Sequence, residues 1–177
     1  MLAYSPAMQT SCFANKDDSY FGNYPTLAEL NDTYGEKAAQ VWLIPQLTDL
    51  SEFCGARDKF TENQLRQCSE IIATDYKKRK VSEMMLFFSY FKRGHFGRFY
   101  GAIDPLIILD ALTQFCNDCG AIYEKHEQQI QHEQREAQKE GTCSWEEYAE
   151  MAGLKDKTSP LERIKAYINS KQERKRK

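Results

Sequence analysis

The longest regular pattern in the sequence is an apolar seam in the stretch PLIILDALTQFCNDCGAIYEKH, residues 105–126. Its members recur at alternating spacings of four and three: Ile108, Leu112, Phe115, Cys119, Ile122 and His126. This alternation is the heptad repeat of a helix that packs along one face. Asp104 and Pro105 come just before it, as a cap and a favourable first-turn residue. The sequence therefore predicts one long helix, of which the almost wholly polar part, residues 128–141, projects from the body of the protein.

Helix start signals open several shorter segments, at Thr26, Thr61, Ser144 and Ser159. Apolar side chains at spacings of three and four follow in residues 43–54, 65–76 and 84–91. Pro45 lies within the first of these stretches, and a proline costs about 3 kcal/mol inside a regular helix. We therefore expect a kink or two separate helices there.

No segment alternates polar and apolar residues for long enough to predict a strand, so the predicted fold class is mainly α. We expect a single-domain bundle of about six to seven helices with one long, partly projecting helix. The side chains expected to be buried together are Trp42, Leu47, Leu50, Ile72, Phe87, Phe91, Ile108, Leu112 and Phe115.

The same patterns divide the chain into regions. Residues 1–24 are rich in Ser, Asn and Asp and lack a period, so they predict a loose N-terminal arm. The further expected regions are a helical core at 25–127, a polar extension of the long helix at 128–141, short C-terminal helices at 142–170 and a basic tail at 171–177.

Composition places the chain among soluble globular proteins, with 41% hydrophobic and 28% charged residues. The longest apolar stretch, MMLFFSYF, is far shorter than the roughly 18 residues of a membrane span. The first residues lack the basic and apolar regions of a secretory signal. The six cysteines are then expected to be reduced thiols. These features predict a cytoplasmic protein with no membrane partner.

The net charge of -2 conceals a strong segregation of charge along the chain. Residues 1–65 carry a balance of -5 and residues 66–103 a balance of +5. Residues 104–154 carry -8, and residues 155–177 carry +6. Two basic patches could therefore meet an anionic partner, while the acidic helix would repel it.

The stretch FKRGHFGRFYGAIDP, residues 91–105, is the strongest candidate for a binding loop. Its glycines permit a helix stop and a close backbone approach, its aromatic rings can stack on bases, and its cations can contact phosphates. The basic run KKRK ends the neighbouring helix. The candidate nucleic-acid-binding residues are Lys77, Lys78, Arg79, Lys80, Lys92, Arg93, His95, Arg98, Phe99 and Tyr100. The competing interpretation is that the cations stabilise helix ends and the rings only pack.

The sequence does not favour a zinc site or a catalytic nucleophile. The pair Cys116 and Cys119 with His126 could suggest zinc, but Cys119 lies on the apolar seam and no second CxxC follows. The sequence contains neither a GxSxG nucleophile elbow nor the Lys-Ser/Thr that a phosphate-binding loop requires. We therefore expect no metal, no cofactor and no enzymatic activity.

Three stretches together carry a resemblance: YPTLAELNDTYG, VWLIPQLTDLSEFCG and KVSEMMLFFSYFKRGHFGRFYGAIDPLIILDAL. They resemble an uncharacterised, domain-of-unknown-function family of short helical proteins from anaerobic gut-type bacteria and their mobile elements. The pattern FFxxFKxGxxGxFYGxxDPxxI is specific, and the similarity spans roughly residues 20 to 150. A looser likeness exists to helical domains of phage-type replication initiators and helicase loaders. A nucleotide-binding loop is missing, so an ATP-driven role is not implied.

These observations favour a non-enzymatic accessory protein of a bacterial mobile element or phage-like region. It would bind DNA or RNA, or a replication or mobilisation protein, through residues 77–80 and 92–100. The alternative is a protein–protein adaptor that docks through the acidic long helix and makes no contact with nucleic acid.

Overall fold

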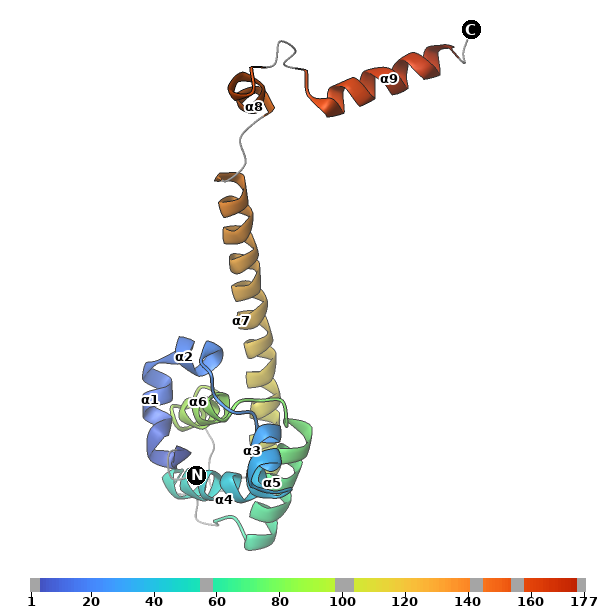
Figure 1. Ribbon diagram of the computed structural model, residues 1–177. Helices are drawn as coiled ribbons and strands as arrows, with labels where there is room; N and C mark the ends of the chain where they lie inside the picture. The colour runs from blue at the N-terminus through green and yellow to red at the C-terminus, as the bar shows by residue number, and fades with distance from the viewer. Residues whose placement is uncertain (1–3, 55–58, 98–103, 141–144, 154–157, 175–177) are drawn as a thin grey trace. The chain divides into compact units, whose positions relative to one another are not determined.

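The computed structural model describes residues 4–54, 59–97, 104–140, 145–153 and 158–174. Within these ranges the regular elements are helices, and the one β-type pairing is an isolated bridge between Thr26 and Lys80 (Figure 1). The predicted mainly α fold is confirmed. The chain divides into two compact units, residues 1–122 and 123–177.

The helices of the first unit are η2 (Pro6–Met8), α1 (Gln9–Ala14), α2 (Lys16–Phe21), α3 (Leu27–Tyr34), α4 (Ala38–Phe53), α5 (Glu62–Asp75) and α6 (Val81–Lys92). The unit boundary falls inside the next helix, α7 (Pro105–Glu140). The second unit continues with α8 (Trp145–Met151) and α9 (Pro160–Arg174).

Helix α6 lies at the centre of the first unit, and its residues 81–89 are all buried. Helices α1, α2 and α4 pack against it, and α4 also packs against α3 and α5 (Figure 1). The ring of Phe87 has the rings of Phe91, Phe96 and Phe115 around it, at centroid distances of 6.0, 5.5 and 5.6 Å. All the side chains that the sequence predicted to be buried together are buried, so the predicted core is confirmed.

The helix starts follow the capping signals of the sequence. Thr26 and Glu29 form a complete capping box, as do Thr61 and Gln64. Pairing between the side chain of one residue and the backbone of the other also joins Ser159 to Glu162 at the start of α9. Asp104 accepts a hydrogen bond from the N–H of Leu106 (2.9 Å) at the start of α7, whereas Ser144 lies outside the described residues.

Helix α6 begins without a capping hydroxyl. The N–H of Val81, its first residue, donates to the carbonyl of Pro25 (2.8 Å), which belongs to the segment before α3. A backbone group from a distant part of the chain thus supplies one of the acceptors that a helix N-terminus lacks.

Helix α4 continues through Pro45 as one helix, so of the two alternatives expected there, a kink or two separate helices, the second is wrong. The proline ring removes the hydrogen bond that the carbonyl of Val41 would otherwise accept. The side chains of both Pro45 and Val41 are exposed, so this carbonyl lies on the solvent side of the helix. The opposite side of the helix buries Leu43, Leu47 and Leu50.

The structure places α1 and α2 in the stretch that was expected to be a loose arm. Each is six residues long, too short for a 3.6-residue period to be visible in the sequence. Cys12 and Tyr20 are buried, and Ser19 donates a hydrogen bond from its hydroxyl to the carbonyl of Cys12 (2.9 Å). Both helices pack against α6, so this stretch contributes to the core.

The second unit contains the polar end of α7 together with α8 and α9. Residues 127–138 of α7 are exposed on every side, which fits their polar composition. In α8 the rings of Trp145 and Tyr148 lie 5.5 Å apart, and Ala149 is buried. Across the described parts of both units, none of the helices has the length and apolar character of a membrane-spanning segment.

Candidate nucleic-acid interface

The basic segment Lys77–Lys80 joins α5 to α6, and its backbone is tied to α3. The carbonyl of Lys77 accepts a hydrogen bond from the N–H of Ala28 (2.8 Å). The carbonyl of Arg79 accepts one from the N–H of Leu27 (3.0 Å). These N–H groups belong to the first turn of α3 and have no partner within that helix. The segment is therefore a structural junction, whatever its side chains bind.

Two side chains of this segment are committed to contacts inside the protein. Arg79 donates from Nη1 to Oε1 of Glu83 (3.2 Å) and from Nη2 to the carbonyl of Cys116 (3.3 Å). The other oxygen of Glu83 accepts from the N–H of Lys80 (2.8 Å), and the Glu83 side chain is 3% exposed. Lys80 itself donates from Nζ to the carbonyls of Tyr20 (2.8 Å) and Gly22 (2.9 Å).

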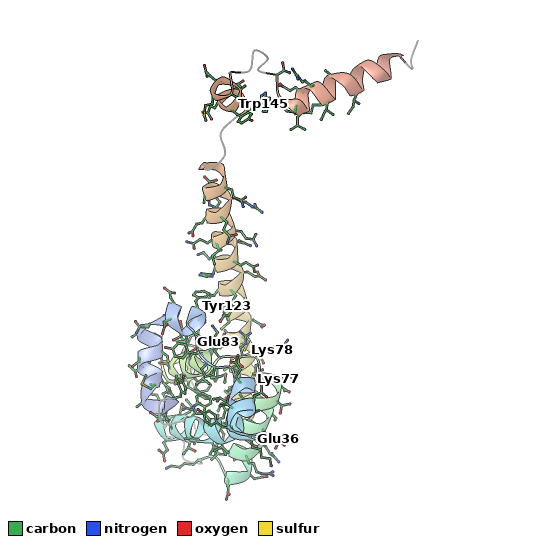
Figure 2. The ribbon with its side chains drawn as sticks, viewed as in Figure 1. Glu36, Lys77, Lys78, Glu83, Tyr123 and Trp145 are labelled. Atoms are coloured by element: carbon green, nitrogen blue, oxygen red, sulfur yellow. The ribbon has the colours of Figure 1, made fainter. Side chains whose placement is uncertain are left out.

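Lys77 and Lys78 are the two exposed cations of the segment. Figure 2 shows both at the surface, whereas Glu83 lies within the body of the unit. The charged ends of these two lysines are therefore accessible to an anion.

Helix α6 ends at a second group of cations. Lys92 forms an ion pair with Asp49 of α4, and its Nζ lies 5.4 Å from the centre of the Phe53 ring. Its side chain is 16% exposed. Lys92 therefore joins α6 to α4 and offers little charge to a ligand.

Arg93 and His95 lie in a different environment, which we call the Phe13 cluster: Phe13, Lys16, Tyr90, Arg93 and His95. The guanidinium of Arg93 lies 3.9 Å from the centre of the Phe13 ring, and Nζ of Lys16 lies 4.5 Å from it. Lys16 also lies 5.1 Å from the centre of the Tyr90 ring, against which the His95 ring packs at 4.8 Å. Lys16, Arg93 and His95 are exposed.

The cations of the Phe13 cluster differ from Arg79 and Lys92, which form ion pairs. Among the described residues, neither Lys16 nor Arg93 has a carboxylate oxygen within ion-pair distance. Arg93 donates to the hydroxyl of Ser89 (2.8 Å), and the stacking on Phe13 fixes its direction without cancelling its charge. Asp17 and Asp18 follow Lys16 in the chain and border the cluster on one side.

The glycine turn after α6 has the predicted form where it is described. Gly94 and Gly97 have positive φ angles of 74° and 103°, so Gly94 ends the helix as expected. The ring of Phe96 packs 6.1 Å from that of Phe91. Three candidate binding residues of the loop lie outside the described residues: Arg98, Phe99 and Tyr100.

The two cationic groups lie at opposite ends of α6. A helix of 12 residues is roughly 18 Å long at 1.5 Å per residue. The exposed cations of the two predicted segments are therefore separated by about the length of this helix and form two areas, Lys77 with Lys78 and the Phe13 cluster.

Cys116 and Cys119 of α7 lie in environments that favour packing over metal binding. Cys119 is fully buried, and burial raises the pKa of its thiol to about 12. Burial also raises the pKa of Cys116, although the Arg79 guanidinium acts in the opposite direction. A thiol with a raised pKa is a poor metal ligand at neutral pH. Over the described ranges, no group of three or more His, Cys, Asp and Glu side chains is arranged to hold a metal ion.

Sequence reasoning missed the contribution of α1 and α2 to this site. Both Phe13 and Lys16 lie in the stretch predicted to be a loose arm, yet the Phe13 ring lies against the guanidinium of Arg93, and Lys16 lies over the rings of Phe13 and Tyr90. The available signal was local: Asn15 stands before Lys16, Asp17 and Asp18, and acidic residues favour the first turn of a helix. Nothing in the sequence pairs that helix with the end of α6.

The fold and these two areas define a helical protein with cationic, partly aromatic surface groups. Residues 59–159 match the sequence pattern of a family of unknown function, DUF6633. Since the match covers more than half of the sequence, the chain belongs to that family. Searches of curated proteins and of solved structures find no match.

Proposed function

We propose that this protein is a non-enzymatic accessory protein that binds nucleic acid through the Phe13 cluster and the glycine loop that follows α6. Lys77 and Lys78 form a second, weaker contact area at the other end of the helix. Arg79, Lys80 and Lys92 support the fold and do not contact the ligand.

One observation carries this proposal: two exposed cations, Lys16 and Arg93, are positioned by an aromatic ring and have no carboxylate partner in the described part of the chain. Charges fixed in this way attract phosphates without first giving up an ion pair. A guanidinium stacked on a ring still directs its N–H groups outward. Sequence-independent contacts of this kind dominate the affinity of many proteins for nucleic acid.

The biological setting is a further part of the proposal. The resemblance to proteins of bacterial mobile elements, and the looser likeness to replication initiators and helicase loaders, favour a role beside a replication or mobilisation protein in the cytoplasm. Membership of the family supports no activity by itself. Fold-level likeness does not carry function, so the site chemistry is what must be tested.

The experiment measures binding to single-stranded and double-stranded DNA and RNA across a range of salt concentrations. We expect log affinity to fall linearly with log salt, and Lys16→Ala with Arg93→Ala to flatten that slope by about one or two units. Lys37→Ala with Lys59→Ala is the matched control. It removes the same charge from exposed positions outside both areas.

Equal slopes for the double variant and the parent protein would contradict the proposal, provided that circular dichroism shows both to be folded. Equal losses in the Lys37 and Lys59 control would mean that net charge alone drives binding. The same measurements on Lys77→Ala with Lys78→Ala show whether the second area contributes.

A second candidate function is the protein–protein adaptor. It is favoured by residues 127–138 of α7, which are exposed and acidic, and by the exposed Leu161, Ile164 and Ile168 of α9 at helical spacing. An adaptor of this kind would show no salt-dependent binding of nucleic acid, so the experiment above separates the two candidates.

A further inference from the structure

A small pocket in the first unit is lined by residues of α3, by Trp42 of α4 and by Tyr4 and Pro25 of the segments that precede α3. Its volume is about 150 Å³. Three aromatic side chains, Tyr4, Tyr34 and Trp42, line it together with the carboxylate-bearing Glu29 and the aliphatic Leu30. We call it the Trp42 pocket. None of these residues belongs to the Phe13 cluster.

Two hydrogen bonds to the backbone carbonyl of Tyr4 hold part of the aromatic lining in place. The indole N–H of Trp42 donates to the carbonyl of Tyr4 (2.8 Å), and Gln46 donates to the same carbonyl (3.1 Å). These bonds attach the N-terminal segment to α4 and satisfy the polar edge of the indole. Trp42 therefore contributes the carbon atoms of its indole ring to the pocket lining, because its N–H is already hydrogen-bonded. Tyr34, at 63% exposure, forms the solvent side.

Glu29 supplies the one negative charge of the lining. Its Oε2 accepts hydrogen bonds from the N–H (2.7 Å) and the hydroxyl (3.0 Å) of Thr26, and these bonds hold the pKa of the carboxyl below its ordinary value. The carboxylate is therefore ionised at neutral pH. In the described part of the chain no Lys, Arg or His lies within ion-pair distance of Glu29.

Two further carboxylates, Asp32 and Glu36, are exposed close to Glu29 in the chain. The basic segment Lys77–Lys80 is joined to the first turn of the same helix through its backbone. The capping role of Glu29 requires only an oxygen acceptor, and Gln64 performs the same role at the start of α5. The capping box would therefore form without the negative charge of Glu29.

We propose that the Trp42 pocket binds a small organic cation, namely a quaternary or fully N-methylated ammonium group. Aromatic ring faces attract such cations, and a carboxylate at the edge completes the site. At roughly 30 Å³ for each water-sized group, the volume accepts about five non-hydrogen atoms, the number in tetramethylammonium. A primary ammonium is strongly hydrated and would need acceptors that ring carbon does not provide.

The test uses fluorescence of Trp42 in a Trp145→Phe background, which leaves Trp42 as the single tryptophan reporter. Choline chloride is titrated at constant ionic strength. Its uncharged isostere, 3,3-dimethylbutan-1-ol, is titrated in parallel. We expect a saturable change with choline and binding of the isostere at least about threefold weaker, because the isostere lacks the cation–π attraction.

Two variants locate the site. Glu29→Gln keeps the capping box and removes the charge, and Tyr34→Leu removes an exposed ring. Each is expected to weaken choline binding about three- to fivefold. The controls are Glu36→Gln, exposed and outside the pocket, and Tyr148→Leu in the second unit. Both should bind choline as the parent does.

Peptides with trimethyl-lysine or unmodified lysine distinguish a free cation from a modified side chain. Saturable binding of either choline or the trimethyl-lysine peptide, sensitive to Glu29→Gln and Tyr34→Leu, supports the proposal. Equal binding of choline and its isostere overturns it. An absence of saturable binding for both cations, or affinities unchanged in both pocket variants, also overturns it.

Discussion

Arg79 and Glu83 form an ion pair with Nη1 and Oε1 3.2 Å apart, and the Glu83 side chain is almost completely buried. The same carboxylate accepts the N–H of Lys80 at the start of α6. Two of the four residues in the basic run, Arg79 and Lys80, therefore make contacts inside the protein that stabilise its fold. The pair also explains why an acidic side chain can lie inside an apolar helix, since each of its carboxylate oxygens accepts a hydrogen bond.

Glu83→Ala is therefore expected to lower the free energy of unfolding by about 2–4 kcal/mol. It leaves the partly buried Arg79 without its counter-charge and the N–H of Lys80 without its acceptor. Urea denaturation followed by circular dichroism measures the change. Glu36→Ala, at an exposed position labelled in Figure 2, is the control and should stay within about 0.5 kcal/mol of the parent. Equal stability of Glu83→Ala and the control would show that the pair is not stabilising.

Lys80 and Lys78 of the basic run should differ in the same assay. Lys80→Met removes two hydrogen bonds from a charged donor to the carbonyls of Tyr20 and Gly22, so we expect a loss of about 1–3 kcal/mol. Lys78→Met removes an exposed charge and should leave stability nearly unchanged. A similar loss of stability in both variants would mean that the hydrogen bonds from Lys80 to the two carbonyls add no stability beyond that of its charge.

Phe96→Ala and Phe99→Ala separate packing from binding within the glycine loop. The Phe96 ring is half-buried and packs against Phe87 and Phe91, so its removal is expected to destabilise the protein by about 2–4 kcal/mol with little specific effect on affinity for nucleic acid. If Phe99 stacks on a base, Phe99→Ala costs about 1–3 kcal/mol of binding and little stability. Stability loss in Phe99→Ala without loss of affinity would assign that ring to the core.

Cys68 gives a prediction about pH. Burial raises the pKa of its thiol to about 11, so the folded state holds the proton more tightly than the unfolded state does. This contribution to stability is fully present below the ordinary thiol pKa near 8.5–9 and is lost as the pH rises toward 11. Under reducing conditions, the parent should lose about 2–3 kcal/mol more than Cys68→Ala between pH 8 and pH 11. Parallel curves for the two proteins would show that the thiol does not titrate differently on folding.

Signals that act between near neighbours in the chain were enough to predict most of the fold. Three helix starts were predicted from Thr26, Thr61 and Ser159. This was possible because a hydroxyl and an acidic or amide side chain three residues apart are enough to form the cap. The buried apolar faces of the helices were predicted correctly because the residues on one helix face recur every three to four positions. The expectation of two separate helices at Pro45 was wrong because the cost of a proline depends on whether the affected carbonyl faces solvent, which is a tertiary property.

The candidate site was less accessible to such reasoning. A sequence shows that Arg79, Lys80 and Lys92 are charged, but their partners come from Cys116, Tyr20 and Asp49, far away in the chain. Which cations remain exposed is decided by those contacts. The aromatic support of Arg93 is likewise supplied by a short helix with no visible period.

The hydrogen bonds between the segment before α3 and the segment before α6 couple two helix starts that are distant in the chain. Leu27 and Ala28 depend on carbonyls next to α6, and Val81 depends on the carbonyl of Pro25. Opening either start would break the bonds of both, so the two helices should unfold as a single cooperative segment in native-state hydrogen exchange. Residues 59–159, cut out alone, would lack Pro25 and all of α3. The smallest fragment that preserves this coupling has to extend to the N-terminal side of the matched region.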